Sequence, residues 1–373
     1  MESGKNKRII ISGGGTGGHI FPAIAIANAL KKLDPSTEIL FVGAEGRMEM
    51  ERVPAAGYKI IGLNIRGIQR KSILKNLALP FKLIGSIMKS MKIIKDFKPD
   101  AVVGVGGYAS GPLLYAASLK KIPYLIQEQN SYAGVTNKRL GKRARKICVA
   151  FDDMEQFFPK DRIVKTGNPV RRASVDIGGK REQALAEFKL SPDKKTILVV
   201  GGSLGARTLN DTMLNDLERI TAADVQLIWQ TGKHYYKDIK RLMGDDIHPN
   251  VRMVEFFDRM DLAYAAADII ISRAGAGTIA ELCIVGKPVI LVPSPNVAED
   301  HQTKNAKNLV QDNAAEYIAD RKAGRKLTTA ALELLKDEKR QKMLSEGISK
   351  LALPDADNVI AGEVFKIAIE NSH

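Results

Sequence analysis

The stretch that decides the fold runs from Ile9 to Leu30 and reads IIISGGGTGGHIFPAIAIANAL. An apolar, strand-like run leads into a glycine loop, and a helix-like segment follows the loop. Glycine lets the backbone turn tightly and approach a ligand, and the N–H groups at the start of the next helix favour an anion. This order of strand, loop and helix predicts the first unit of a doubly wound α/β domain with a phosphate-binding loop.

The loop matches the dinucleotide fingerprint only in part. Gly13, Gly15 and Gly18 satisfy G-x-G-x-x-G, but a nicotinamide-binding domain also needs an acid about 20 residues further on, after the second strand. The acid nearest to that place is Glu45, and His19 and Pro22 follow the glycines at once. We therefore treat a nicotinamide-dependent enzyme as the weaker interpretation.

A second pattern of the same kind starts after residue 165 and contains TILVVGGSLGARTLNDTM. Short apolar strands alternate with helical segments in both halves, which is typical of parallel sheets with crossover helices. The sequence thus predicts two tandem Rossmann-like doubly wound α/β domains with an interdomain cleft. We place them at residues 1–165 and 166–350, and we expect a C-terminal helix within residues 351–373 to pack back on the first domain.

The charge of the chain is unevenly distributed. The net charge is +15 over 373 residues, yet residues 1–165 hold 28 Lys and Arg against 13 Asp and Glu, whereas residues 166–373 hold 29 of each kind. Such asymmetry predicts that the first half faces an anionic partner. Two cysteines, no signal-peptide pattern and no apolar run of spanning length favour a cytoplasmic protein.

One basic stretch, from Arg70 to Lys98, has eight basic residues and a single acid. Its apolar residues recur at helical spacing, so it can form an amphipathic helix on an anionic membrane. For the helix after Pro80 we prefer an ordinary domain helix with its apolar side in the core. For Ile73 to Leu79 we prefer membrane docking, together with Lys138 to Lys146.

Eight segments, taken in order, carry a resemblance to a known family. They are GGGTGGHIFPAIAIA, GVGGYASGPLLYAA, EQNSYAGVTNKRL, TGNPVR, GGSLGARTLN, SRAGAGTIAEL, GKPVILVPSP and HQTKNA. Together they resemble the bacterial transferases that add N-acetylglucosamine (GlcNAc) to undecaprenyl-pyrophosphoryl-MurNAc-pentapeptide in peptidoglycan synthesis. The resemblance spans nearly the whole chain and is weakest over residues 45–98.

The resemblance implies the glycosyltransferase B architecture and an inverting transfer from UDP-GlcNAc to the C4 hydroxyl of MurNAc. It implies no cofactor and no active-site metal. The donor would bind mainly the C-terminal domain and the lipid acceptor the N-terminal domain, on the cytoplasmic face of the plasma membrane. The partners would be these two substrates and an anionic membrane surface, without nucleic acid.

Site residues follow from the resemblance position by position. In the first domain, His19 is our choice for the catalytic base, with Glu128 as the weaker candidate; a histidine that only hydrogen-bonds the loop is the alternative. Thr16, Gly17 and Gly18 match the acceptor-side phosphate loop. Asn130 and Arg171 match positions near the sugar and the phosphates, although Arg171 could also be a surface charge.

The second domain supplies the donor residues. Glu281 would accept hydrogen bonds from the ribose hydroxyls, because a carboxylate offers two oxygens to a diol; its alternative is a first-turn helix acid. Ser203 would contact the diphosphate, or cap a helix. The backbone of Phe257 would recognise uracil, or its ring would be a core aromatic. Gln302 would bind the sugar, or be a solvated helix residue. The backbone of Ala276, Gly277 and Thr278 would lie near the nucleotide.

Two residues depart from the family pattern: Leu204 stands where glutamine is usual, and Gln127 where histidine is usual. The first change removes a polar contact and the second excludes a titrating side chain there; we interpret both as divergence.

Two other classes of protein remain open from the sequence. A UDP-GlcNAc 2-epimerase would share the architecture and the donor but would need no lipid acceptor. A nucleic-acid-binding protein would explain the charge, but paired phosphate loops and 6% aromatic residues do not favour it.

Overall fold

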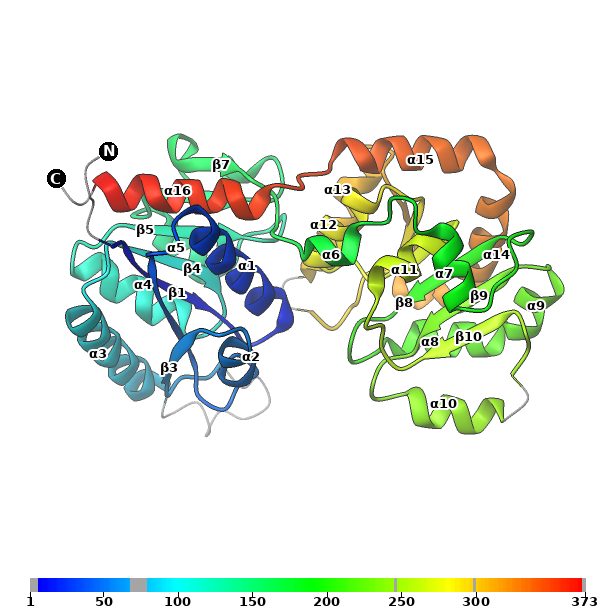
Figure 1. The fold of residues 1–373 in the computed structure, drawn as a ribbon, viewed down its shortest axis with the longest axis horizontal. Coiled ribbons are helices and arrows are strands. Elements are labelled where there is room, and N and C mark those ends of the chain that lie inside the picture. The colour runs from blue at the N-terminus through cyan, green and yellow to red at the C-terminus, as the bar shows by residue number, and fades with distance from the viewer. Residues whose placement is uncertain (1–5, 68–78, 245–246, 298–299, 371–373) are drawn as a thin grey trace. The chain divides into compact units, whose positions relative to one another are not determined.

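The computed structural model describes residues 6–67, 79–244, 247–297 and 300–370. It divides into two compact units (Figure 1): unit 1 comprises Met1–Val170 with Pro354–His373, and unit 2 comprises Arg171–Leu353. The boundaries fall after Val170 and after Leu353, whereas the sequence placed them after residues 165 and 350. Each unit is an α/β domain with one parallel sheet, as the sequence predicted.

Unit 1 is built on a sheet of seven parallel strands in the order β3-β2-β1-β4-β5-β6-β7. The strands are β1 (Arg8–Gly13), β2 (Glu38–Ala44), β3 (Lys59–Leu63), β4 (Ala101–Gly106), β5 (Tyr124–Glu128), β6 (Lys146–Val149) and β7 (Ile163–Lys165). The helices are α1 (Gly17–Leu33), α2 (Glu49–Ala55), α3 (Leu79–Phe97), α4 (Ser110–Leu119), α5 (Val135–Gly141) and α16 (Ala356–Glu370). Short 3₁₀ turns at Met154–Gln156 and Lys160–Arg162 precede β7.

Both faces of this sheet are covered, because successive strand residues point to opposite sides. Ile10 packs with residues of α3 and α4 in one apolar cluster. Ile9 and Ile11 pack on the other face with residues of α1 and α16. The chain therefore returns from unit 2 to complete the core of unit 1.

Unit 2 has six parallel strands in the order β10-β9-β8-β11-β12-β13. These are β8 (Thr196–Val200), β9 (Gln226–Gln230), β10 (Val251–Val254), β11 (Ile269–Ser272), β12 (Val289–Leu291) and β13 (Glu316–Tyr317). The helices are α6 (Arg172–Val175), α7 (Arg181–Glu187), α8 (Arg207–Asn215), α9 (Leu217–Ala222), α10 (Tyr236–Met243), α11 (Met260–Ala266), α12 (Ala276–Val285), α13 (His301–Gln311), α14 (Ala323–Lys336) and α15 (Glu338–Lys350).

The order of the strands reverses once in each sheet, between β1 and β4 and between β8 and β11. In doubly wound sheets, ligands bind beyond the carboxyl ends of the strands at such a reversal. Each glycine loop found in the sequence follows the first strand of its unit and lies at this place.

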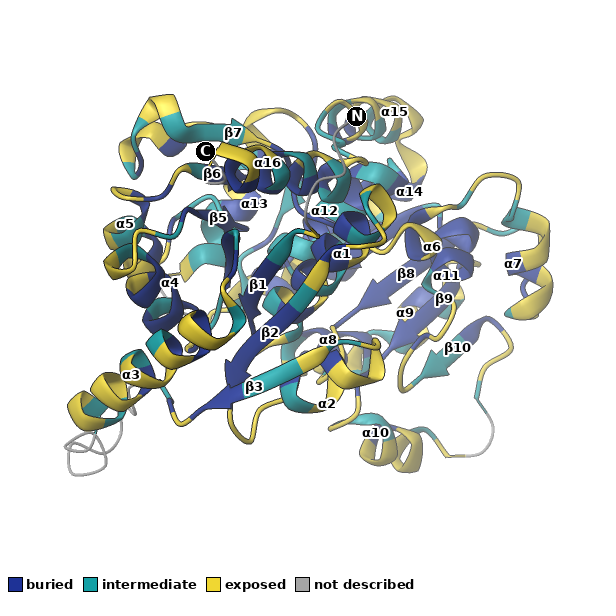
Figure 2. Cartoon of the chain, turned by 60° about the vertical axis from the view of Figure 1, so that its left-hand side comes forward, coloured by how far each residue is buried: buried dark blue, intermediate teal, exposed yellow. Residues whose placement is uncertain are grey.

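The sequence predicted that the apolar side of α3 packs in the core, but the structure leaves several of its apolar side chains exposed. Phe81 is 78% exposed and Met88 62% exposed, and Ile84 is also exposed, whereas Ser86 and Ser90 are buried. Figure 2 shows the exposed residues along this helix. The interpretation of α3 as an ordinary domain helix is therefore wrong over its first three turns. Most of the preceding segment, Ile73 to Leu79, lies outside the described residues.

No helix in the described parts of the chain is both long enough and apolar enough to cross a bilayer.

Candidate active site

The first glycine loop interlocks with the end of β4. The Gly14 N–H donates to the Gly106 carbonyl at 3.3 Å. Gly107 has a φ of +91°, and a Cβ on it would lie 2.4 Å from the Gly14 carbonyl oxygen. Both the left-handed backbone and this close approach require glycine, so the two loops at the strand reversal form one rigid platform.

His19 lies on this platform. Its Nδ1 is 3.2 Å from the Gly14 carbonyl oxygen and 3.3 Å from Thr16 Oγ1. A carbonyl oxygen only accepts, so the contact with Gly14 favours the tautomer that carries the proton on Nδ1 and the lone pair on Nε2. The imidazole packs against the end of β4, since a Cβ on Gly106 would lie 2.5 Å from its Cδ2. The histidine thus both hydrogen-bonds the loop and presents a nitrogen that can accept a proton.

The start of α1 offers N–H groups to a ligand. The N–H groups of Thr16, Gly17 and Gly18 donate to no other described residue, and the Thr16 side chain does not cap the helix. The first turn of a helix carries a partial positive charge, so these donors suit a phosphate oxygen. The loop therefore keeps donors for an anion although its Gly14 N–H is already used.

Glu128, the weaker candidate for the base, has a different role. It is buried at the end of β5, and its oxygens accept from the Asn130 N–H at 3.1 Å, the Gly134 N–H at 3.1 Å and Asn137 Nδ2 at 2.8 Å. Burial raises the pKa of Glu128, and these hydrogen bonds oppose the rise. Since both oxygens already accept from its own loop, Glu128 is better placed to shape the Asn130 turn than to accept a substrate proton.

Gln127, which departs from the family pattern, belongs to a buried amide network. Its Nε2 donates to Asn168 Oδ1 at 2.8 Å, Asn168 Nδ2 donates to the Gln129 carbonyl at 3.0 Å, and Gln129 Nε2 donates to the Val105 carbonyl at 2.6 Å. The network joins β4, β5 and the segment that leads into unit 2. Gln127 is therefore a structural residue beneath the site.

The second glycine loop, Gly201–Ala206, connects β8 to α8. Gly205 has a φ of +85°, and a Cβ on Gly232 would lie 2.1 Å from the Gly205 nitrogen. Ser203 is exposed, and its hydroxyl bonds to no described residue. The N-cap of α8 is Ala206, so the alternative that Ser203 caps the helix is wrong. Leu204 is 58% exposed in the same loop, where a glutamine would point a polar group outward.

The start of α12 lies across the strand reversal from this loop. Gly275 is its N-cap without a capping side chain, and Ala276, Gly277 and Thr278 form its first turn. Glu281 comes one turn later, and α12 has no acid in its first turn, so the first-turn alternative for Glu281 is wrong.

The Glu281 carboxylate keeps one oxygen available. The Tyr264 hydroxyl donates to Oε2 at 3.0 Å, and Oε1 has no partner among the described residues. Burial raises the pKa of Glu281, while the Tyr264 hydrogen bond and the charge of Arg171 oppose the rise. A half-buried carboxylate held on one side can accept hydrogen bonds from a ligand hydroxyl on the other.

Three further donor-site candidates have distinct surroundings. Gln302 Oε1 accepts from the Ser294 N–H at 2.8 Å, which leaves its amide NH₂ for a ligand and contradicts a simply solvated residue. Phe257 is buried and packs edge-on against Phe188 with ring centroids 5.9 Å apart, so its ring is a core aromatic and only its backbone could read a base. Arg171 Nε donates to Ser174 Oγ at 2.9 Å.

The structure adds residues that sequence reasoning missed. Glu49 accepts from two backbone N–H groups, one of them in the first glycine loop, and Tyr264 orients Glu281. Neither residue stands in a glycine-rich pattern. Gly106 and Gly107, by contrast, belong to the glycine-rich segment GVGG, and this pattern could have indicated the close approach of that segment to Gly14.

Comparisons with known proteins agree along the chain. Residues 9–149 match the glycosyltransferase family 28 N-terminal domain, and residues 196–360 match the glycosyltransferase family 28 C-terminal domain. A protein of Phocaeicola vulgatus is 59% identical over 98% of this chain and 97% of its own length. One of Flavobacterium psychrophilum is 52% identical over 96% and 97%. Both carry the name UDP-N-acetylglucosamine--N-acetylmuramyl-(pentapeptide) pyrophosphoryl-undecaprenol N-acetylglucosamine transferase.

Solved structures give the same result for the fold. The crystal structure of MurG from Acinetobacter baumannii is 30% identical, with a TM-score of 0.78 over 96% of this chain and 99% of that one. A UDP-GlcNAc 2-epimerase from Neisseria meningitidis has a TM-score of 0.64 at 17% identity, over 96% of this chain and 100% of that one. The second likeness shows a shared fold alone.

Proposed function

Since the chain belongs to glycosyltransferase family 28, we infer that it is a hexosyltransferase that moves GlcNAc from UDP-GlcNAc to lipid-linked MurNAc-pentapeptide in peptidoglycan synthesis. The observation that carries this inference is the identity of 52–59% to transferases of that name over nearly the full length of both chains. The epimerase alternative is weaker, because its likeness is limited to the fold.

We propose that the donor binds the carboxyl edge of the unit 2 sheet. The free oxygen of Glu281 would accept from the ribose hydroxyls. Ser203 and the N–H groups of Gly277 and Thr278 would hold the diphosphate at the strand reversal, with Arg171 nearby. The backbone at Phe257 would read uracil, and the NH₂ group of Gln302 would hold the sugar. Three groups without a partner among the described residues support this donor site: Oε1 of Glu281, the Ser203 hydroxyl and the NH₂ group of Gln302.

The acceptor would bind unit 1 with its pyrophosphate on the N–H groups of Thr16, Gly17 and Gly18, and with Asn130 near the sugars. In a single inverting displacement, the C4 hydroxyl of MurNAc attacks C1 of GlcNAc, Nε2 of His19 takes the hydroxyl proton, and UDP departs. A base of this kind contributes roughly a hundred- to ten-thousand-fold, and preorganised donors to the leaving diphosphate add about 3–4 kcal/mol each.

The test is UDP release from UDP-GlcNAc with and without the lipid-linked acceptor, in the wild type, Glu281→Ala and His19→Gln. We expect release only with acceptor, a raised donor KM in Glu281→Ala, and a lowered kcat in His19→Gln. Release without acceptor would instead support an epimerase or a hydrolase. We also expect full activity in EDTA; strict dependence on a divalent metal would contradict the mechanism.

We further propose that unit 1 docks on an anionic membrane through α3 and α4. These helices pack together, and their exposed side chains include Phe81, Ile84 and Met88 on α3 and Tyr115 and Leu119 on α4. Lys92 and Lys95 are exposed on α3. Apolar side chains among lysines suit the headgroup region of an anionic leaflet.

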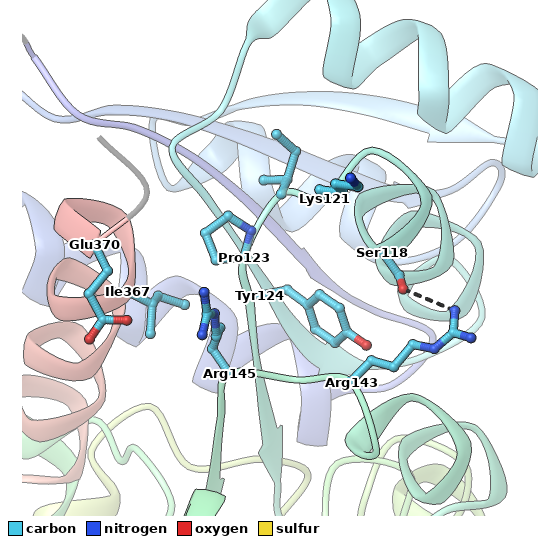
Figure 3. Close-up of a pocket in the computed structure, with 9 residues that line it drawn as sticks. Ser118, Lys121, Pro123, Tyr124, Arg143, Arg145, Ile367 and Glu370 are labelled. Carbon is cyan, nitrogen blue, oxygen red and sulfur yellow. Dashed lines mark hydrogen bonds between the residues drawn. The ribbon is translucent and has the colours of Figure 1, made fainter. Parts of the chain in front are cut away.

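A basic cavity at the C-terminal end of α4 is a second candidate contact for a lipid (Figure 3). It measures about 240 Å³ and is lined by Lys121, Arg143 and Arg145, with Ile367 and Glu370 of α16 on one side. It lies at the amino ends of β5 and β6, at the opposite edge of the sheet from His19. Burial raises the pKa of the adjoining Tyr124 to about 12, so that phenol stays neutral. The three cations suit a lipid phosphate.

A further inference from the structure

The carboxylate of Glu49 lies beneath the first glycine loop and has no part in the mechanism above. It is 1% exposed, on α2. Its Oε2 accepts from the Gly15 N–H at 2.8 Å, and its Oε1 accepts from the Ala44 N–H at 3.0 Å. A buried carboxylate is costly unless hydrogen bonds satisfy it, and here two backbone donors do so.

The same peptide unit connects this carboxylate to His19. The Gly15 nitrogen that donates to Glu49 and the Gly14 carbonyl that accepts from His19 Nδ1 belong to one peptide bond. The groups therefore form a continuous chain: Nδ1–H of His19, the Gly14–Gly15 peptide, and the Glu49 carboxylate. Successive hydrogen bonds polarise one another, by roughly 10–30% per bond.

We propose that Glu49 is a positioning residue that fixes the tautomer of His19 and increases the basicity of its Nε2 through the Gly14–Gly15 peptide. The carboxylate draws the Gly15 proton, which makes the Gly14 carbonyl a stronger acceptor for Nδ1–H. When Nε2 takes a proton, the positive ring is stabilised by the aligned peptide and the buried negative charge. In serine hydrolases a carboxylate does this by direct contact with histidine; here a peptide unit lies between them.

Among the described residues, the other charged or titratable groups near the loop do not hydrogen-bond the Gly14–Gly15 peptide. Tyr108, after β4, lies beside Gly15, and the Arg47 guanidinium is 5.8 Å from the centre of the Tyr108 ring. Glu45, after β2, pairs with Lys89 at 3.1 Å. Among these groups, Glu49 is the one whose carboxylate bonds the peptide that holds His19.

The inference rests on the proposed role of His19 as the base, but its first test does not use activity. Nitrogen NMR of the five histidines, with the His19 signal assigned by its loss in His19→Gln, reports which ring nitrogen carries the proton. We expect the Nδ1–H tautomer in the neutral wild type. We expect mixed tautomers and a titration midpoint at lower pH in Glu49→Gln. An Nε2–H wild type, or an unchanged His19 signal in Glu49→Gln, would overturn the proposal.

Kinetics supply the second test. In metal sites, loss of a hydrogen bond that orients a ligand histidine typically costs about 10–100-fold in activity, and we take the same range by analogy. In Glu49→Gln we expect a fall of this size in kcat with the donor KM unchanged, and the acid limb of the pH profile moved to lower pH. Glu51→Gln removes an exposed carboxylate from the same helix and should change neither readout.

Two outcomes separate this proposal from the one it rests on. If Glu49→Gln folds poorly, Glu49→Asp provides a second variant that keeps the negative charge and should retain the wild-type tautomer of His19. Loss of that tautomer in Glu49→Asp would count against a role for the charge. If the tautomer depends on Glu49 but His19→Gln keeps full activity, the proposed effect of Glu49 on His19 is supported and the assignment of His19 as the catalytic base fails.

Discussion

The proton on the His19 ring is placed by a backbone carbonyl. Because the Gly14 oxygen can only accept, this hydrogen bond favours a proton on Nδ1, and in that tautomer the nitrogen that can work as a base is Nε2. The packing of the ring on Gly106 then fixes where Nε2 lies. The position of Nε2 therefore depends on a close contact between two segments, which a motif cannot specify.

Gly106→Ala tests this dependence. Gly106 has a φ of +107°, and a Cβ there would collide with the imidazole. We expect kcat to fall by about a hundredfold, the cost of a misplacement near 1 Å, with little change in the donor KM. Gly57→Ala is the matched control, because Gly57 also has a positive φ, of +86°, but has nothing within 4 Å of its Cβ position. An equal loss of kcat in both variants would show backbone strain alone.

Among the elements, α3 departs most clearly from its sequence pattern. Its apolar residues do recur at helical spacing, but the face that packs inward buries Ser86, Ser90 and Ile94 and leaves Phe81 and Met88 exposed. Periodicity identifies an apolar stripe on a helix without saying what covers it. Here the stripe and the buried face are largely different faces.

Vesicle co-sedimentation tests the membrane proposal for this helix. Lys92→Glu with Lys95→Glu should lower binding to anionic vesicles by more than tenfold at low salt, since each lysine near the surface contributes about 1 kcal/mol. Phe81→Ser with Met88→Ser should lower it at all salt concentrations. Lys237→Glu with Lys240→Glu, on the exposed side of α10 in unit 2, makes the same charge change and should bind as the wild type does. Unchanged binding in both α3 variants would contradict the proposal.

At the scale of the whole molecule, the last helix belongs to the first domain. After unit 2 ends at Leu353, α16 inserts Ile360, Val364 and Ile367 into the core formed by α1 and one face of the unit 1 sheet. The N-terminal segment therefore cannot complete its core without residues more than 180 positions further along the chain. This arrangement ties the folding of unit 1 to the presence of the C-terminus.

Ile360→Ala should destabilise unit 1 by about 2–5 kcal/mol, the usual cost of such a cavity. Hydrogen exchange would detect the loss of protection in β1, β4 and α1, with unit 2 unchanged. Val359→Ala is the control, because Val359 is exposed on the same helix and its truncation should cost no more than about 0.5 kcal/mol. Loss of protection in unit 2 as well would show that the two units unfold together.

The sequence by itself determined the two parallel-sheet domains and the two glycine loops, together with the family and its reaction. Those features depend on short-range patterns: apolar runs of strand length, glycines directly after them, and motifs in a fixed order. Only the tertiary structure decided that Ser203 does not cap α8, that Glu128 is bound by its own loop, that α3 exposes its apolar side chains, and that Glu49 lies under the first loop. The first two depend on the exact backbone geometry of a loop, which a motif does not specify. The last two depend on segments far apart in the chain, and a pattern of neighbouring residues carries no record of which distant groups pack or hydrogen-bond together.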